Sequence, residues 1–281
     1  MNLQWYPGHM TKARRAMEEN IKLVDVIVEI RDARVPLSSA NPDLKSMGQG
    51  KKRIVVLNKT DLADPQLSQE WTRFFSEEGL IPLSLDAREK KSCSRILGEL
   101  QILAAEKKER DLKRGIKNRP ARIMVAGIPN VGKSTLINSL AGRASAKTGD
   151  KPGVTRGLQW IRLGNSLELL DTPGLLWPRF EDRQAGLNLA LVGAIREEVL
   201  PVEELALQGI EILHSRYPAA FRERYGFSPQ EASDTLLELA LSQGLLQKGA
   251  EGDRSRAAAR FLDDLRKGRL GRITLESPSW Q

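Results

Sequence analysis

The chain has 281 residues, of which 40% are hydrophobic, 28% charged and only 5% aromatic. This length suggests about two domains with room for a buried core, and the composition is that of a soluble globular protein. No apolar run approaches the roughly 18 residues of a membrane span, and no signal-peptide core opens the sequence. These features argue against a membrane or secreted protein, and we expect a cytoplasmic one.

The net charge of +8 is spread unevenly along the chain. Residues 181–281 carry 13 Lys and Arg against 16 Asp and Glu, whereas residues 1–180 carry 31 against 20. The basic residues gather in residues 107–122, in residues 147–162 and in a late cluster of Arg254, Arg256, Arg260, Arg266, Lys267, Arg269 and Arg272. Any one cluster could be a solvated helix face, but the three together favour a polyanionic partner, RNA in particular.

Hydrophobic periodicity predicts an α/β fold, a mostly parallel sheet with flanking helices, followed by a smaller all-α region. We expect strands over residues 24–30, 53–57, 80–83, 122–126, 158–163 and 167–170. We expect helices over residues 11–23, 65–78, 93–113, 135–140, 203–214, 229–241 and 255–267. His214 falls on a late helix and is expected to be structural. The single cysteine, Cys93, lies in a polar run and is expected to be an incidental surface thiol in a reducing compartment.

A polar loop, residues 31–36, follows the first predicted strand, and the sequence N-K-x-D follows the second, at Asn58, Lys59 and Asp61. The Asp61 carboxylate can accept two hydrogen bonds, from guanine N1–H and from the 2-amino group. Adenine offers neither donor, so a buried carboxylate would remain unpaired beside it. Asn58 is expected to brace neighbouring loops, and the Lys59 stem is expected to cover the base.

The third predicted strand ends in Ser84-Leu85-Asp86-Ala87. Short loops at this position commonly give backbone N–H groups to guanine O6, although this sequence matches that pattern only loosely. Ser84 and Asp86 are therefore candidate base-binding residues.

Residues 127–134 match the phosphate-binding loop G-x-x-x-x-G-K-[ST] at every fixed position. A β-prone run precedes the loop and a helical pattern follows it, which is the order that directs successive N–H groups and a helix N-terminus at a phosphate. Lys133 is expected to reach the β- and γ-phosphates, and the Ser134 hydroxyl is expected to ligate Mg²⁺. The residues expected to bind phosphate are Asn130, Val131, Gly132, Lys133, Ser134 and Thr135.

Two further motifs follow the phosphate-binding loop. Thr155 lies in a glycine-rich segment, where it is placed to be a second Mg²⁺ hydroxyl ligand when a γ-phosphate is present. The last predicted strand runs into D-x-x-G, with Asp171 expected to hold Mg²⁺ through water and the Gly174 N–H expected to sense the γ-phosphate. Together the motifs predict a GTP-binding protein.

The motifs stand in an unusual order, because N-K-x-D precedes the phosphate-binding loop. A parallel sheet tolerates such circular permutation, since the loops still meet at one edge. This order, with D-A-R-x-P at residues 32–36 and Trp-Tyr-Pro-Gly-His at residues 5–9, closely resembles the circularly permuted GTPase family of ribosome biogenesis GTPase A. The resemblance implies a P-loop GTPase domain over residues 1–180, a helical RNA-binding domain over residues 181–281, and a role in assembly of the bacterial 50S subunit.

Signalling GTPases place a water-orienting glutamine directly after D-x-x-G, but here that position is Leu175. The family that this chain resembles also has an apolar residue there, so another group must orient the water. His9, ahead of the first helix, is the better of the two histidines, and its alternative role is to cap or pack that helix. In related GTPases an asparagine at the position of Asn130 helps to ligate K⁺, which can replace an arginine finger.

The sequence thus predicts a Mg²⁺-dependent GTPase that acts as a monomer on a large-subunit precursor, without DNA or membrane partners. A GTP-gated RNA- or ribosome-binding module with incidental hydrolysis is the alternative. A general RNA chaperone that uses its basic surface alone is a third reading. Switch II, residues 172–186, leads directly into the helical region, so nucleotide state could reorient that region.

Overall fold

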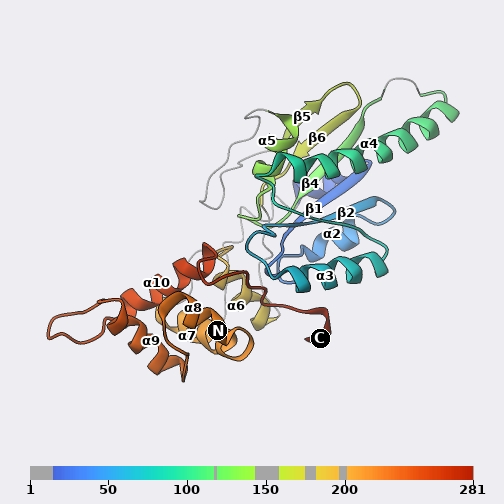
Figure 1. Ribbon diagram of the computed structural model, residues 1–281. Coiled ribbons are helices and arrows are strands. Elements are labelled where there is room, and N and C mark those ends of the chain that lie inside the picture. Colours follow the sequence, from blue (N-terminus) through green and yellow to red (C-terminus); the bar gives the residue numbers. More distant parts are fainter. Residues whose placement is uncertain (1–14, 117–118, 143–157, 175–181, 196–200, 281) are drawn as a thin grey trace.

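A computed structural model of the chain describes residues 15–116, 119–142, 158–174, 182–195 and 201–280 (Figure 1). Its centre is a six-stranded sheet in the order β3-β2-β1-β4-β6-β5. The strands are β1 (Val26–Asp32), β2 (Lys52–Asn58), β3 (Ile81–Leu85), β4 (Ala121–Ala126), β5 (Gln159–Leu163) and β6 (Leu167–Asp171). All neighbouring pairs are parallel except β5 and β6, which form an antiparallel hairpin. The predicted α/β class and the mostly parallel sheet are confirmed.

The helices of the sheet part are α2 (Pro42–Met47), α3 (Pro65–Glu77), α4 (Lys90–Lys113) and α5 (Lys133–Ala141), preceded by an N-terminal helix whose described part is residues 15–21. Those that follow the sheet are α6 (Arg183–Leu191), α7 (Val202–Arg216), α8 (Pro218–Tyr225), α9 (Ala232–Ser242) and α10 (Arg254–Arg266), and a 3-10 turn spans Pro278–Trp280. Among the described helices, none combines the length and apolar character needed to cross a membrane.

Helices cover both faces of the sheet because successive strand residues point to opposite sides. Ile96 and Leu100 of α4 and Leu136 of α5 share one core with alternate residues of β1, β2, β4 and β6. On the other face, Met17 and Leu44 pack with residues of β1, β4 and β6. Trp71 of α3 and its neighbours close the remaining part of that face. The sheet is therefore buried on both sides, as parallel sheets are.

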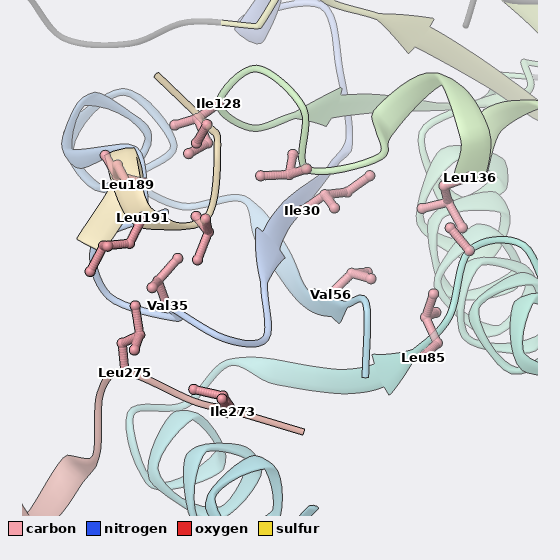
Figure 2. Packing of buried hydrophobic residues seen from close by; sticks show 14 of the residues in the cluster. Ile30, Val35, Val56, Leu85, Ile128, Leu136, Leu189, Leu191, Ile273 and Leu275 are labelled. Atoms are coloured by element: carbon pink, nitrogen blue, oxygen red, sulfur yellow. The ribbon is translucent and has the colours of Figure 1, made fainter. Parts of the chain in front are cut away.

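The first core continues from the sheet into the helices that follow it. Figure 2 shows Ile30, Val35 and Ile128 at the sheet edge beside Leu189 and Leu191 of α6. The C-terminal segment returns to the sheet part, where the Ile273 N–H donates to Leu62 O and the Leu275 N–H donates to Arg34 O, each over about 3 Å. The Trp71 indole N–H donates to Glu276 O. The proposed boundary at residue 180 falls in a segment outside the described residues.

Two sequence-based expectations about single residues are wrong. Cys93 is buried at the start of α4, and its thiol donates to Ala87 O, so it is no surface residue. The polar run around Cys93 gave a wrong prediction because only one face of an amphipathic helix packs against the core. His214 is exposed on α7, next to the buried Leu213, so it does not pack inside the helical part.

Candidate nucleotide-binding site

The phosphate-binding loop joins β4 to α5, as the sequence predicts. Gly132 caps α5 with φ 97°, and a Cβ there would lie 2.3 Å from Asn58 Nδ2, so only glycine fits. Asn130 also has a left-handed backbone, with φ 61°. Non-glycine residues rarely adopt this conformation, and such residues cluster at ligand-binding sites. Val131 is buried beside them, and Ser134 and Thr135 follow in the first turn of α5.

Lys133 lies inside the loop rather than in solvent. Its side chain is buried, and Nζ donates to Gly127 O over 3.1 Å and to Ile128 O over 2.8 Å. Burial lowers the pKa of Lys133 to about 8, although the nearby Asp171 carboxylate acts in the opposite direction. A buried ammonium group held by two carbonyl oxygens is preorganised to meet an anion, which is the role expected of this lysine.

Asp171 ends β6 next to the loop and is 1% exposed. Its Oδ1 is buried and has no hydrogen-bond partner among the described residues. Burial raises the pKa of Asp171 to about 6, and Lys133 opposes that rise. A buried carboxylate oxygen without a hydrogen-bond partner is a hard ligand suited to Mg²⁺. Gly174 lies against the loop, since a Cβ there would come within 2.8 Å of Pro129 N.

Asn58 connects the N-K-x-D segment to two other loops. Its Nδ2 donates to Val131 O over 2.6 Å, and its Oδ1 accepts from the Ala87 N–H over 2.8 Å. The side chain is 3% exposed, so both hydrogen bonds are shielded from water. The geometry is that of the bracing role predicted for Asn58.

Lys59 has φ 65°, and its Nζ forms a 2.9 Å ion pair with Asp32 Oδ2. Asp32 also accepts two hydrogen bonds from the Arg34 guanidinium, through Nε and Nη2. Burial alone would raise the pKa of Asp32, but Arg34 and Lys59 hold it well below its usual range. The D-A-R-x-P segment therefore positions the lysine of N-K-x-D, a connection that the sequence analysis did not predict.

Arg34 and Asn130 both reach the end of α6. Arg34 Nη2 donates to Val192 O over 3.3 Å, and Nη1 donates to Arg266 O over 3.2 Å. Asn130 Nδ2 donates to Gly193 O over 3.2 Å. Arg266 from α10 binds the preceding carbonyls, Ala190 O and Leu191 O. The phosphate-binding loop and the loop of residues 31–36 are thus both hydrogen-bonded to the helical part.

Asp61 and Asp86 come together around a residue that the sequence analysis missed. Arg88 Nη2 lies 2.5 Å from Asp61 Oδ2 and 2.7 Å from Asp86 Oδ2. Hydrogen bonding to Arg88 lowers the pKa of Asp86, an effect that burial partly offsets. The signal available in the sequence was an arginine two residues after an aspartate at a strand end. Ser84 faces α3, with its hydroxyl 3.0 Å from Thr72 Oγ1, so its role in base binding stays a prediction.

Several predicted site residues fall outside the described residues. These are His9, Thr155, Leu175 and the first part of switch II after Gly174. Their roles stay predictions. Within the described part, the strand ends bring Asn58, Lys133 and Asp171 to one sheet edge, where ligands of parallel sheets bind.

The strand order explains how the motifs meet although their order in the chain is changed. β4, which leads into the phosphate-binding loop, lies between β1 and β6, and β2 lies beyond β1. The N-K-x-D loop therefore lies at the same sheet edge as the phosphate-binding loop, although it comes earlier in the chain. This arrangement defines a circularly permuted P-loop GTPase.

Comparison with known proteins gives the particular family. A family model described as a 50S ribosome-binding GTPase matches residues 122–212, from β4 into α7. Ribosome biogenesis GTPase A of Bacillus cereus is 42% identical over 99% of this chain and 95% of its own length, and that of Priestia megaterium is 43% identical over 99% and 98%. The chain belongs to the ribosome biogenesis GTPase A family.

Solved structures of this family have the same fold. GDP-bound TM YlqF matches 94% of this chain and 100% of its own chain, with a TM-score of 0.71 and 29% identity. GNP-bound YlqF from T. maritima matches 95% and 98%, with a TM-score of 0.67 and 29% identity. The permuted fold is therefore shared over nearly the whole chain.

Proposed function

We propose that this GTPase acts in late assembly of the bacterial 50S ribosomal subunit. In this proposal it binds a precursor particle and its rRNA in the GTP state and hydrolyses GTP on the particle, in the cytoplasm and as a monomer. The observation that carries the proposal is the 42–43% identity to ribosome biogenesis GTPase A over 99% of the chain. The Asn58–Val131 hydrogen bond holds the N-K-x-D segment beside the phosphate-binding loop, which supports one nucleotide as the ligand of both.

The proposal includes Mg²⁺ held by the hydroxyls of Ser134 and Thr155 and, through water, by Asp171. The buried, unpaired Asp171 Oδ1 supports this assignment, because such an oxygen needs a cation or a donor. When bound, the ion supplies positive charge to the phosphate oxygens. Lys133 adds charge from the protein side, and the Asn130 side chain is our candidate ligand for K⁺. The Asn130–Gly193 hydrogen bond uses its Nδ2 and supports an orientation that leaves the side-chain oxygen for the cation.

For hydrolysis, an apolar Leu175 cannot orient water, so we assign that task to His9. An imidazole can accept a hydrogen bond from water near neutral pH. In this proposal docking on the particle places His9 at the γ-phosphate. Catalysis is therefore slow until the protein has docked.

The helical domain, residues 181–281 in our proposal, responds to the nucleotide through α6. Hydrogen bonds from Arg34 and Asn130 to Val192 and Gly193 support this coupling. Asn130 lies in the phosphate-binding loop, and Arg34 binds Asp32, which pairs with Lys59 of N-K-x-D. A change at the γ-phosphate that moves either loop must therefore break these hydrogen bonds or move the end of α6 with the loop. Exposed Arg256, Arg260 and Lys267 on α10 and just after it offer positive charge to rRNA.

Co-sedimentation with purified large-subunit precursor particles tests the proposal. We expect binding with a non-hydrolysable GTP analogue and much weaker binding with GDP. A matched control is Asp61→Asn, which should bind particles with the xanthosine analogue and not with the guanosine analogue. Equal binding with GTP analogue, GDP and no nucleotide would instead support an RNA chaperone. GTP-dependent binding without particle-stimulated turnover would support the GTP-gated module.

A further inference from the structure

Arg88 bridges two carboxylates on neighbouring loops of the base-binding region. Its Nη2 contacts Asp61 Oδ2 over 2.5 Å, and its Nε contacts both oxygens of Asp86 over 3.0 and 3.1 Å. The Arg88 side chain is 66% exposed, whereas Asp86 is 12% exposed. Arg88 is therefore anchored mainly on Asp86, and it extends one nitrogen to Asp61.

The contact with Asp61 uses an atom that guanine also needs. Guanine offers two parallel donors, N1–H and the 2-amino group, to the two oxygens of one carboxylate. A guanidinium group offers the same kind of parallel N–H donors. Asp61 Oδ1 is buried and lacks a hydrogen-bond partner among the described residues, while Oδ2 is bound to Arg88. A base with two donors needs Oδ2 as well and meets the Arg88 donor there, whereas a base with one donor can use Oδ1 alone.

We propose that Arg88 is a specificity-determining residue that competes with guanine for Asp61. Guanine displaces the Arg88 guanidinium from Asp61 Oδ2, and Arg88 stays bound to Asp86. The competition lowers the affinity for every guanine nucleotide equally, because it acts on the base and not on the phosphates. It also narrows the preference for guanine over hypoxanthine, which lacks the 2-amino group. This inference rests on guanine binding at Asp61, as in the proposed function.

Competition and simple electrostatics predict opposite signs for removal of Arg88. Loss of a positive charge near an anionic nucleotide should weaken nucleotide binding, because it removes a long-range attraction. Loss of a competitor should tighten it. Because the pair is exposed, the gain is small, about three- to fivefold in dissociation constant. Tighter binding is therefore diagnostic of competition.

The experiment is calorimetric titration of Arg88→Ala with GDP and with inosine diphosphate. GDP should bind about three- to fivefold more tightly than to wild type, and inosine diphosphate should bind within about twofold of wild type. Arg95→Ala is the matched control, because Arg95 is another exposed arginine a few residues further along the chain, on α4. It should leave both affinities unchanged. Unchanged or weaker GDP binding to Arg88→Ala, or equal tightening by Arg95→Ala, would overturn the proposal.

A second background separates this inference from the base assignment itself. In Asp61→Asn, xanthosine diphosphate is the ligand and the amide attracts Arg88 far less than a carboxylate does. Adding Arg88→Ala should then leave xanthosine diphosphate affinity unchanged. Tightening in this background would contradict competition at Asp61. If Asp61→Asn binds GDP as wild type does, the assignment of Asp61 as the guanine-binding residue fails instead.

Discussion

Asn58 Nδ2 donates to the backbone oxygen of Val131 over 2.6 Å, so the base-binding segment directly holds the phosphate-binding loop. The two residues are 73 positions apart in the chain. The second bond of Asn58, to the Ala87 N–H, ties in the loop after β3. One side chain thus connects three loops that are expected to contact the nucleotide.

Asn58→Ala should therefore weaken GDP and GTP together. It leaves Val131 O and the Ala87 N–H without their buried partner, and each unpaired group costs about 1–3 kcal/mol. We expect a roughly 10- to 100-fold higher dissociation constant in an equilibrium titration. Asn165→Ala, in the exposed β5–β6 turn, is the control and should bind as wild type. GDP affinity within about twofold of wild type for Asn58→Ala would contradict the bracing role.

Asp61→Asn should exchange the base preference. The amide can donate a hydrogen bond to the C2 carbonyl of xanthine but cannot accept both guanine donors. GTP affinity should fall about 10- to 100-fold, since guanine no longer donates to a charged group, and xanthosine triphosphate should now bind. Competition titrations with both nucleotides measure the exchange. Unaltered GTP affinity would refute the assignment of Asp61 to the base.

Salt dependence should report the contribution of α10 to rRNA binding. Replacing Arg254, Arg256, Arg260 and Lys267 with Ala should flatten the log–log salt slope of particle binding by about 0.7–0.9 for each rRNA phosphate that the protein no longer neutralises. Arg254 contributes least, because it is half-buried and donates to Ser233. Lys45→Ala with Arg73→Ala, both exposed on the sheet part, is the control for charge removal. A slope equal to that of wild type would assign the α10 charges to solvation.

Particle-stimulated hydrolysis should depend on His9. His9→Ala should leave GTP affinity nearly unchanged, because no phosphate or base contact is assigned to it. Stimulated turnover should fall by roughly 10²-fold, the lower end for a positioned proton-transfer group. Replacing K⁺ with Na⁺ should slow wild type and the variant alike, since that effect is assigned to Asn130. If particles stimulate His9→Ala as strongly as wild type, His9 does not orient the water, and its role is to cap or pack the first helix.

The strands and the motifs at their ends could be predicted because both are local. A continuous apolar run, residues 54–57, defines β2, and Asn58 is the last residue of that strand. Short helices could not be predicted, because a local pattern needs several residues to show its period. α2 spans only Pro42–Met47, too few residues for a helical period, and its Asn41 cap becomes visible only once the helix is known.

Contacts between distant segments could not be predicted. Arg34 binds Val192 O across 158 positions, and no local pattern in either segment indicates the other. Glu29 is another case, because a carboxylate in an apolar strand gives no sign of Arg53, 24 positions away, which binds it inside the fold. The pairing of Arg88 with Asp61 belongs to the same class. The hydrogen bonds of Arg34 to Val192 and of Asn130 to Gly193, rather than the strands, carry the coupling proposed between nucleotide and helical domain.

Single-turnover GTP hydrolysis with and without large-subunit precursor particles measures whether the protein is a particle-activated GTPase. We expect slow hydrolysis by the protein alone and acceleration by roughly 10²-fold or more when particles are present in K⁺ buffer. Lys133→Ala, which lacks the buried ammonium group at the phosphates, should show no acceleration. Equal rates for wild type with and without particles would show that the particle does not activate hydrolysis.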